Sequence, residues 1–206
     1  MNISIFVETE RLETDLAPFL VMPLYDEDPR TVVSAIACSI AMEHWSATVA
    51  LLQAGLLPSA AVVHRSQFEA LLRSVWALYA ASDEHLLKLA EPLTLETEQG
   101  AKNLPQTADM MSAVGRKGPA AAYDALNRFK DNSWKALNSY AHAGIHPIKR
   151  HAEGYPPGLI ADLVRNANGL AVLGAMQAVV LSGMQPLQKE VLAIAKRYPN
   201  SMPPPL

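Results

Sequence analysis

The segment SYAHAGIHPIKRH contains three of the chain's six histidines, His142, His146 and His151. Two imidazoles four residues apart share one helix face in helical zinc sites. Here Gly144 and Pro147 interrupt the helix, no HExxH glutamate is present, and the chain's one cysteine lies far away in sequence. We therefore expect no metal and no other cofactor. We expect His142 to close a helix at Gly144 and the two later histidines to belong to a loop.

A second set of polar residues ends at the same histidine. Lys135, Asn138 and His142 follow one another at i, i+3 and i+7, which places a cation, an amide and an imidazole on one helix face. A metal-free ribonuclease needs a base of near-neutral pKa for the 2′-hydroxyl and donors that hold the phosphate. A solvated polar face has the same spacing, so both interpretations stay open.

A third set lies on an earlier helix, in the stretch HRSQFEALLRSVWALY. Arg65, Glu69 and Arg73 follow one another at i+4 steps, and Arg65 borders a stripe of apolar residues. A charge in that position is costly unless it is paired, so the sequence predicts a structural ion pair between Arg65 and Glu69. The alternative is that Arg65 or Arg73 faces a cleft shared with His142 and binds phosphate.

Composition limits the class of protein that can hold these sets. The 206 residues suffice for one domain, and 50% are hydrophobic but only 6% aromatic, which favours close helix packing over aromatic-rich sheets. A net charge of −3 argues against a surface built wholly for nucleic acid. Cys38 cannot form an internal disulfide and is predicted to be buried, in a reducing compartment.

Neither a secretory signal nor a membrane span is expected. The first sixteen residues have no basic region followed by a long apolar run, which predicts a cytoplasmic protein. The most membrane-like stretch, 167–184, contains Asn168 and Gln177 and has no flanking aromatic belt. We interpret it as a buried helix, and expect no membrane partner.

The polar sets must be positioned by helices, and turn residues mark where these begin and end. The sequence predicts an all-α fold, an antiparallel bundle of about five to six helices in one domain spanning 1–206. Its core is expected to cover about 30–198, and the proline-rich segment 199–206 to form a flexible tail. The predicted helices cover 31–55, 57–92, a short piece near 106–114, 120–143, 157–184 and 187–198.

Two of these stretches, HRSQFEALLRSVWALY and LNSYAHAGIHPIKRH, resemble the HEPN-like helical proteins of bacteria. In these proteins an R-x-x-x-E helix pairs with a later helix that ends in a Ser/Tyr-x-His-x-Gly element, and the abortive-infection proteins of the AbiV kind are loosely related. The resemblance covers roughly residues 30–185. It implies an all-α bundle, commonly a homodimer, with a link to toxin–antitoxin or phage-defence systems.

The resemblance also implies a possible activity. Active HEPN ribonucleases carry an Arg-x4–6-His motif; His142 matches the histidine, but Lys135 stands where the arginine would be at the longest spacing. Lysine lacks the bidentate fork that holds phosphate. The expected function is therefore a HEPN-like stress or phage-defence protein with a degenerate ribonuclease site acting on RNA. The alternative is a non-catalytic antitoxin, immunity or regulatory subunit with a cognate protein partner.

Overall fold

The computed structural model describes residues 3–100 and 103–204, and over these ranges the chain is all-α and contains no strand. It has ten α-helices where five to six were expected. Their bounds are α1 Ile3–Leu20, α2 Pro29–Gln53, α3 Leu57–Tyr79, α4 Asp83–Ala90, α5 Leu95–Gly100, α6 Thr107–Lys117, α7 Ala120–Ala141, α8 Ile145–Glu153, α9 Pro157–Leu181 and α10 Gln188–Lys196, with a 3-10 turn η2 at Gln185–Leu187.

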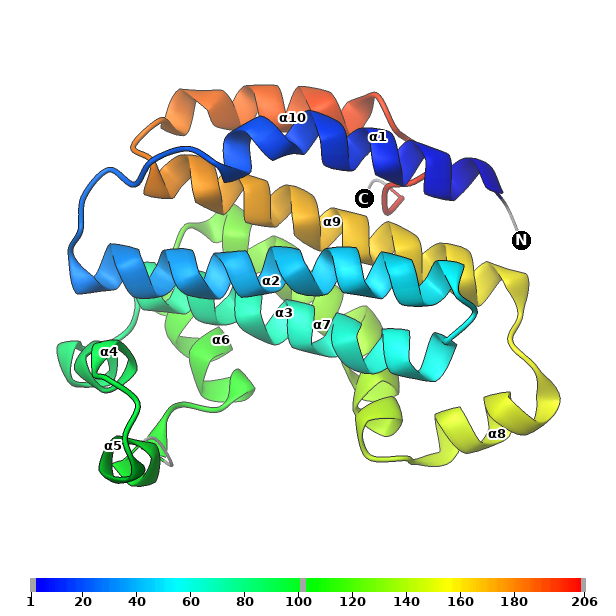
Figure 1. Ribbon diagram of the computed structural model, residues 1–206, viewed down its shortest axis with the longest axis horizontal. Helices are drawn as coiled ribbons and strands as arrows, with labels where there is room; N and C mark the ends of the chain where they lie inside the picture. Colours follow the sequence, from blue (N-terminus) through cyan, green and yellow to red (C-terminus); the bar gives the residue numbers. More distant parts are fainter. Residues whose placement is uncertain (1–2, 101–102, 205–206) are drawn as a thin grey trace.

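The long helices form a layered bundle (Figure 1). α2 and α3 form the antiparallel hairpin that the sequence predicts, and the hairpin turns at Gly55 (φ +76°). α9 runs beside α2, and α1 and α10 cover its other side. α6 and α7 pack on α3. α7, which carries the polar set ending at His142, therefore packs on α3 and also meets α9.

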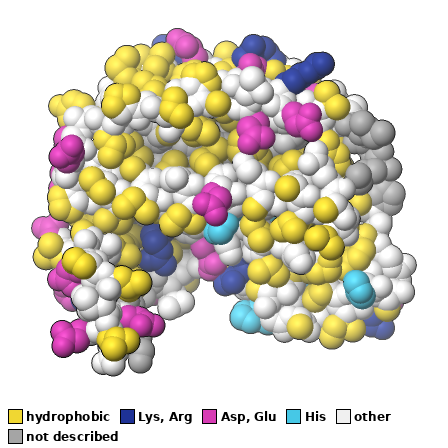
Figure 2. All heavy atoms as spheres, viewed as in Figure 1, with side chains coloured by type: hydrophobic (Ala, Val, Ile, Leu, Met, Phe, Trp, Pro, Cys, Tyr) yellow, Lys and Arg dark blue, Asp and Glu magenta, His cyan; other side chains and the backbone are white. Residues whose placement is uncertain are grey.

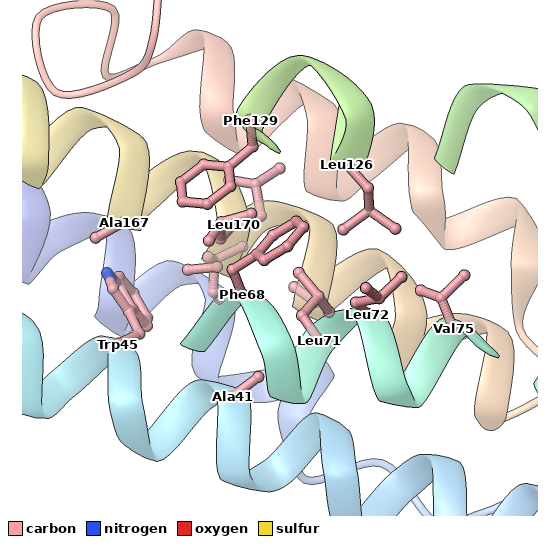
Figure 3. Packing of buried hydrophobic residues seen from close by; sticks show 14 of the residues in the cluster. Ala41, Trp45, Phe68, Leu71, Leu72, Val75, Leu126, Phe129, Ala167 and Leu170 are labelled. Carbon is pink, nitrogen blue, oxygen red and sulfur yellow. The ribbon is translucent and has the colours of Figure 1, made fainter. Parts of the chain in front are cut away.

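The core is built from large side chains of the central helices and small ones of their neighbours. Phe68 of α3 stacks on Phe129 of α7, with ring centroids 4.8 Å apart, and Trp45 of α2 faces Ala167 of α9 (Figure 3). α2 and α9 can approach closely because the side chains at their contact are small. Four alanines there are nearly inaccessible to solvent: Ala41, Ala167, Ala171 and Ala175. Cys38 is buried as predicted, and burial raises the pKa of its thiol to about 12.

The stretch 167–184 that looks most like a membrane span lies mainly in α9 and is buried inside the protein, as expected, with Asn168 and Gln177 both hydrogen-bonded. The one helix that could cross a membrane by length and composition, among the described residues, is instead α2, with a mean hydropathy of 1.4 over its most apolar window. Of that window, 39% is buried inside the protein. Ile36 and Ile40 lie on its exposed side.

The predicted helix over 57–92 is wrong, because the structure divides it into α3 and α4. Ser82 caps a new helix by accepting a hydrogen bond from the backbone N–H of His85. Arg30 of α2 donates to the carbonyls of Ala77 and Ala81, at 3.0 Å each, and to the carboxylate of Asp83. One carbonyl in the last turn of α3 and one in the link to α4 are thus satisfied by a side chain from another helix, which no local pattern reveals.

The predicted loop after Gly144 is also wrong, because residues 145–153 form α8. Its proline, Pro147, stands in the first turn, where the missing N–H has no acceptor in the helix. α7 ends at Ala141, and the left-handed residue is Ala143 (φ +49°) rather than Gly144. Gly144 is needed for close approach instead: a Cβ there would lie 2.6 Å from Ser139 Oγ.

Both ends of the expected core, 30–198, need correction. α1 precedes it and buries Leu12 and Leu16 completely. At the other end, part of the segment expected to be a flexible tail packs on the core: Ser201 is buried, and its carbonyl accepts from Asn168 Nδ2 at 2.8 Å. Pro203 lies against Gly169, where a Cβ would come within 2.7 Å of its ring. Residues 205–206 lie outside the described ranges.

Candidate functional site

The last two turns of α7 carry the polar set that ends at His142. Lys135 and His142 are exposed, and His142 occupies the position that follows the last helical residue, with its N–H donating to the Asn138 carbonyl at 3.1 Å. Asn138 is half-buried, and no donor among the described residues reaches its Oδ1, which is inaccessible to solvent. The three side chains therefore line one end of α7. Among the described residues, no hydrogen bond or ion pair joins their polar side-chain atoms to another group.

Arg65 is held away from solvent by two contacts. Its Nη2 donates to Glu69 Oε1 at 3.0 Å, and its guanidinium lies 4.9 Å from the centre of the Trp134 ring of α7. Thr107 of α6 donates to the same Glu69 oxygen at 3.3 Å. With side chains only 23% and 31% exposed, Arg65 and Glu69 join α3, α6 and α7 as a structural ion pair.

Arg65 and His142 lie at different levels of the bundle. Arg65 contacts Trp134, and His142 follows Trp134 by eight residues, a rise of about 12 Å along a helix. The two helices are antiparallel at this contact, since Phe68 meets both Phe129 and Trp134 while Arg65 meets only the later residue. An anion that contacts both His142 and Arg65 would thus have to span this separation. The Arg65 guanidinium is also already paired with the Glu69 carboxylate.

Arg73 lies elsewhere, in a pocket of about 330 Å³ between α3 and the start of α6. Glu69, Leu104, Pro105, Gln106, Thr107 and Met110 line the rest of the pocket. Arg73 Nη1 is buried, and no acceptor in the part of the chain that the structure describes bonds to it. Burial lowers the pKa of the guanidinium, while the charge of Glu69 opposes that shift. Arg65 and Arg73 therefore do not share one anion site with His142.

A fully buried histidine on α3 is the residue whose role the sequence reveals least. His64 Nδ1 bonds to Gln67 Oε1 at 2.9 Å, and Gln67 Nε2 donates to the carbonyl of Ala167 on α9. Because that amide oxygen can only accept, the ring is protonated at Nδ1, and Nε2 is left buried without a partner among the described residues. Burial lowers the pKa of His64 to about 4, and it stays neutral.

The remaining histidines do not form a metal site. Over residues 3–100 and 103–204 no three His, Cys, Asp or Glu side chains converge as metal ligands would. His146 instead stacks near Tyr140, with centroids 6.5 Å apart, and His151 meets Tyr155 edge-on at the same separation. α8, which carries both, buries none of its described side chains and packs against α7. Its basic side chains and Ile145 and Ile148 face solvent.

A groove of about 580 Å³ lies between α7 and α9. Its floor is apolar, with Phe129, Leu137, Leu163 and Leu170 all buried. Small residues, Ala125, Ala136 and Gly169, form its walls, and Asn132, Ser133 and Asn166 add polar groups half-way along. Pro203 and Pro204 border it on one side. Sequence reasoning missed this groove, since each helix alone reads as an ordinary apolar stripe.

Comparison with known proteins adds a family but no activity. No curated protein matches the chain, and no solved structure matches it. One family, described as a family of unknown function and designated DUF6988, matches residues 38–204, which takes in α3, the groove helices and all the candidate residues. The chain belongs to the DUF6988 family.

Proposed function

We propose that this protein is a non-catalytic interaction module of a bacterial stress or phage-defence system, of the antitoxin, immunity or regulatory kind. The groove between α7 and α9 is the observation that carries the proposal. The resemblance of two of its helices to HEPN-like proteins supports the choice of biological setting. The dispersion of Arg65, Arg73 and His142 over separate places supports binding over catalysis, because a ribonuclease needs its base and its phosphate ligands around one phosphate.

The shape and charge of the groove favour one occupant, an amphipathic helix of a partner protein with an acidic flank. The lining runs from Ala125 to Tyr140 on α7, about 22 Å, a length of about four helical turns. Small wall residues admit a helix backbone closely, and an apolar floor accepts its apolar stripe. Arg165 is paired with Asp162, whereas exposed Arg128 bonds to no described residue, so the groove retains one free positive charge.

Filling the groove should abolish partner binding. We expect Ala136→Arg to remove a stoichiometric partner that co-purifies with the wild-type protein from its native host, because a long charged side chain would project from the groove wall. The matched control is Ser39→Arg, at a solvent-exposed position of α2, and this variant should retain the partner. Quantitative mass spectrometry of the two eluates, with circular dichroism to verify folding, makes the comparison. Equal partner recovery from both variants would refute the groove as the binding site.

A metal-independent ribonuclease is the second candidate, and one observation favours it. Lys135, Asn138 and His142 line the exposed end of α7 next to α8, whose Lys149 and Arg150 add positive charge near that end. Such a surface could hold an RNA phosphate with His142 as the base. The expected homodimer, in which a partner copy supplies an arginine, would fit the same candidate.

The ribonuclease candidate predicts cleavage of RNA in EDTA with 2′,3′-cyclic phosphate ends. His142→Ala should lower the cleavage rate by at least about a hundredfold, as expected for loss of a general base. His151→Ala, on the exposed face of α8, is the control and should cleave normally. The interaction proposal predicts that wild-type protein leaves RNA intact in the same assay. Cleavage that survives His142→Ala would point to a contaminating nuclease.

A further inference from the structure

One half-buried cation in the described structure, Arg73, has a buried guanidinium nitrogen without a hydrogen-bond acceptor. Glu69 Oε1 is already bonded to Arg65 and Thr107, at 3.0 and 3.3 Å. Arg73 forms no hydrogen bond with the described residues, although its Nη1 is inaccessible to solvent. Leaving a guanidinium donor buried without an acceptor costs more than forming the same bond would return. A ligand that supplies the missing acceptor would therefore gain the free energy of this hydrogen bond, because no described residue already bonds to Arg73 Nη1.

The pocket beside Arg73 has the size and charge for an oxyanion. Its volume of about 330 Å³ exceeds that of a phosphate or carboxylate group, so it leaves room for a small attached moiety. Among the described lining residues the ionisable ones are Glu69 and Arg73, and Glu69 is bonded to Arg65 and Thr107, so no carboxylate is hydrogen-bonded to Arg73. Gln106 and Thr107 bring the start of α6 to the pocket, but the capping box of this helix already pairs the Gln106 N–H with the Asp109 carboxylate and the Asp109 N–H with the Gln106 side chain.

The surroundings are consistent with a ligand that enters from solvent. Figure 2 shows charged and histidine side chains at the indentation below α2, between the arm of α4 and α5 and the end that carries α8. Figure 1 draws α6 at this indentation. Met110, Leu104 and Pro105 line the rest of the pocket and would contact the apolar part of a ligand.

We propose that this pocket binds a small metabolite through a phosphate or carboxylate group, with the Arg73 guanidinium as its ligand. The Glu69 carboxylate would accept a hydrogen bond from a hydroxyl or amine of the same molecule. The site is separate from the groove between α7 and α9, so anion binding at Arg73 does not depend on whether a partner protein binds in the groove.

Titration with inorganic phosphate and, separately, with acetate tests the proposal. Chloride at matched ionic strength is the reference, and thermal unfolding with isothermal titration calorimetry gives the readout. We expect phosphate to raise the Tm saturably and to bind with one site per chain. A response to acetate as well would identify a general oxyanion site, and a response to phosphate alone a phosphate site. A response to neither anion would overturn the proposal.

Variants assign the effect to Arg73. Arg73→Met should remove the phosphate response, and Arg73→Lys, which keeps the charge but loses the planar fork, should weaken binding at least about tenfold. Arg11→Met, at an exposed position of α1, is the matched control and should bind as the wild type does. If Arg73→Met does not fold, Arg73→Lys and Thr107→Val decide. Wild-type affinity in both of these variants would show an adventitious ion only and would overturn the proposal.

Discussion

Asn168→Ala is expected to lower the free energy of unfolding by about 4 kcal/mol. Asn168 is fully buried on α9. Its Oδ1 accepts from the Trp45 indole at 2.9 Å, and its Nδ2 donates to Thr9 Oγ1 at 2.9 Å and to the Ser201 carbonyl at 2.8 Å. One amide thus joins α1, α2, α9 and the C-terminal segment. Alanine would remove all three bonds and leave the Trp45 indole N–H and the Ser201 carbonyl without this partner, while Thr9 Oγ1 would keep its bond to the Ile5 carbonyl.

Urea unfolding monitored by circular dichroism gives this free energy directly. The matched control is Asn166→Ala on the same helix, whose side chain is half-exposed and makes one long contact to Ser133 Oγ, at 3.5 Å. It should cost less than about 1 kcal/mol. An Asn168→Ala variant as stable as Asn166→Ala would mean that the three hydrogen bonds of the Asn168 side chain do not stabilise the bundle.

The second large effect concerns pH and the buried imidazole of His64. Its pKa is about 4 in the folded protein, because burial disfavours the charged ring, and the ordinary pKa of an exposed imidazole is 6.5. Between these values the unfolded chain binds a proton that the folded chain does not, so stability falls as the pH drops from 6.5 towards 4. The pKa difference corresponds to a loss of about 3 kcal/mol across that window.

Urea unfolding at pH 7.5, 5.5 and 4.2 measures this loss, and comparison with His64→Gln isolates it from the carboxylates that titrate nearby. The variant should show a flatter dependence on pH by about 3 kcal/mol over the window. His142→Gln, at the exposed end of α7, is the control and should follow the wild type. Parallel curves for wild type and His64→Gln would contradict a neutral, buried His64.

Local patterns in the sequence reveal the fold class, the α2–α3 hairpin and the burial of α9, because helix periodicity and capping residues act over short distances. Two boundaries are wrong for opposite reasons. The break between α3 and α4 depends on Arg30, which is distant in sequence from the carbonyls that it satisfies. α8 forms despite Pro147, because a proline in the first turn removes no helical hydrogen bond.

The candidate site could be predicted only in part. The position of Arg65 at the edge of an apolar stripe indicates its pairing with Glu69, since both lie on one helix. The sequence cannot show that Trp134 covers Arg65, or that Arg73 is left without a partner beside α6, because these contacts join separate helices. Asn168 first stood out only as a polar residue in an apolar stretch, and its three partners come from three distant segments.

Site-specific photocrosslinking tests the proposed binding role most directly. In the native host, a photoreactive amino acid at Ala136, in the groove wall, is compared with one at Ser39, a solvent-exposed position of α2. Binding through the groove predicts one crosslinked species at Ala136, containing a helical segment of a different protein, and none at Ser39. A species of twice the chain's mass would assign the groove to a second copy instead. No crosslink at Ala136, or the same species at both positions, would contradict the proposed role.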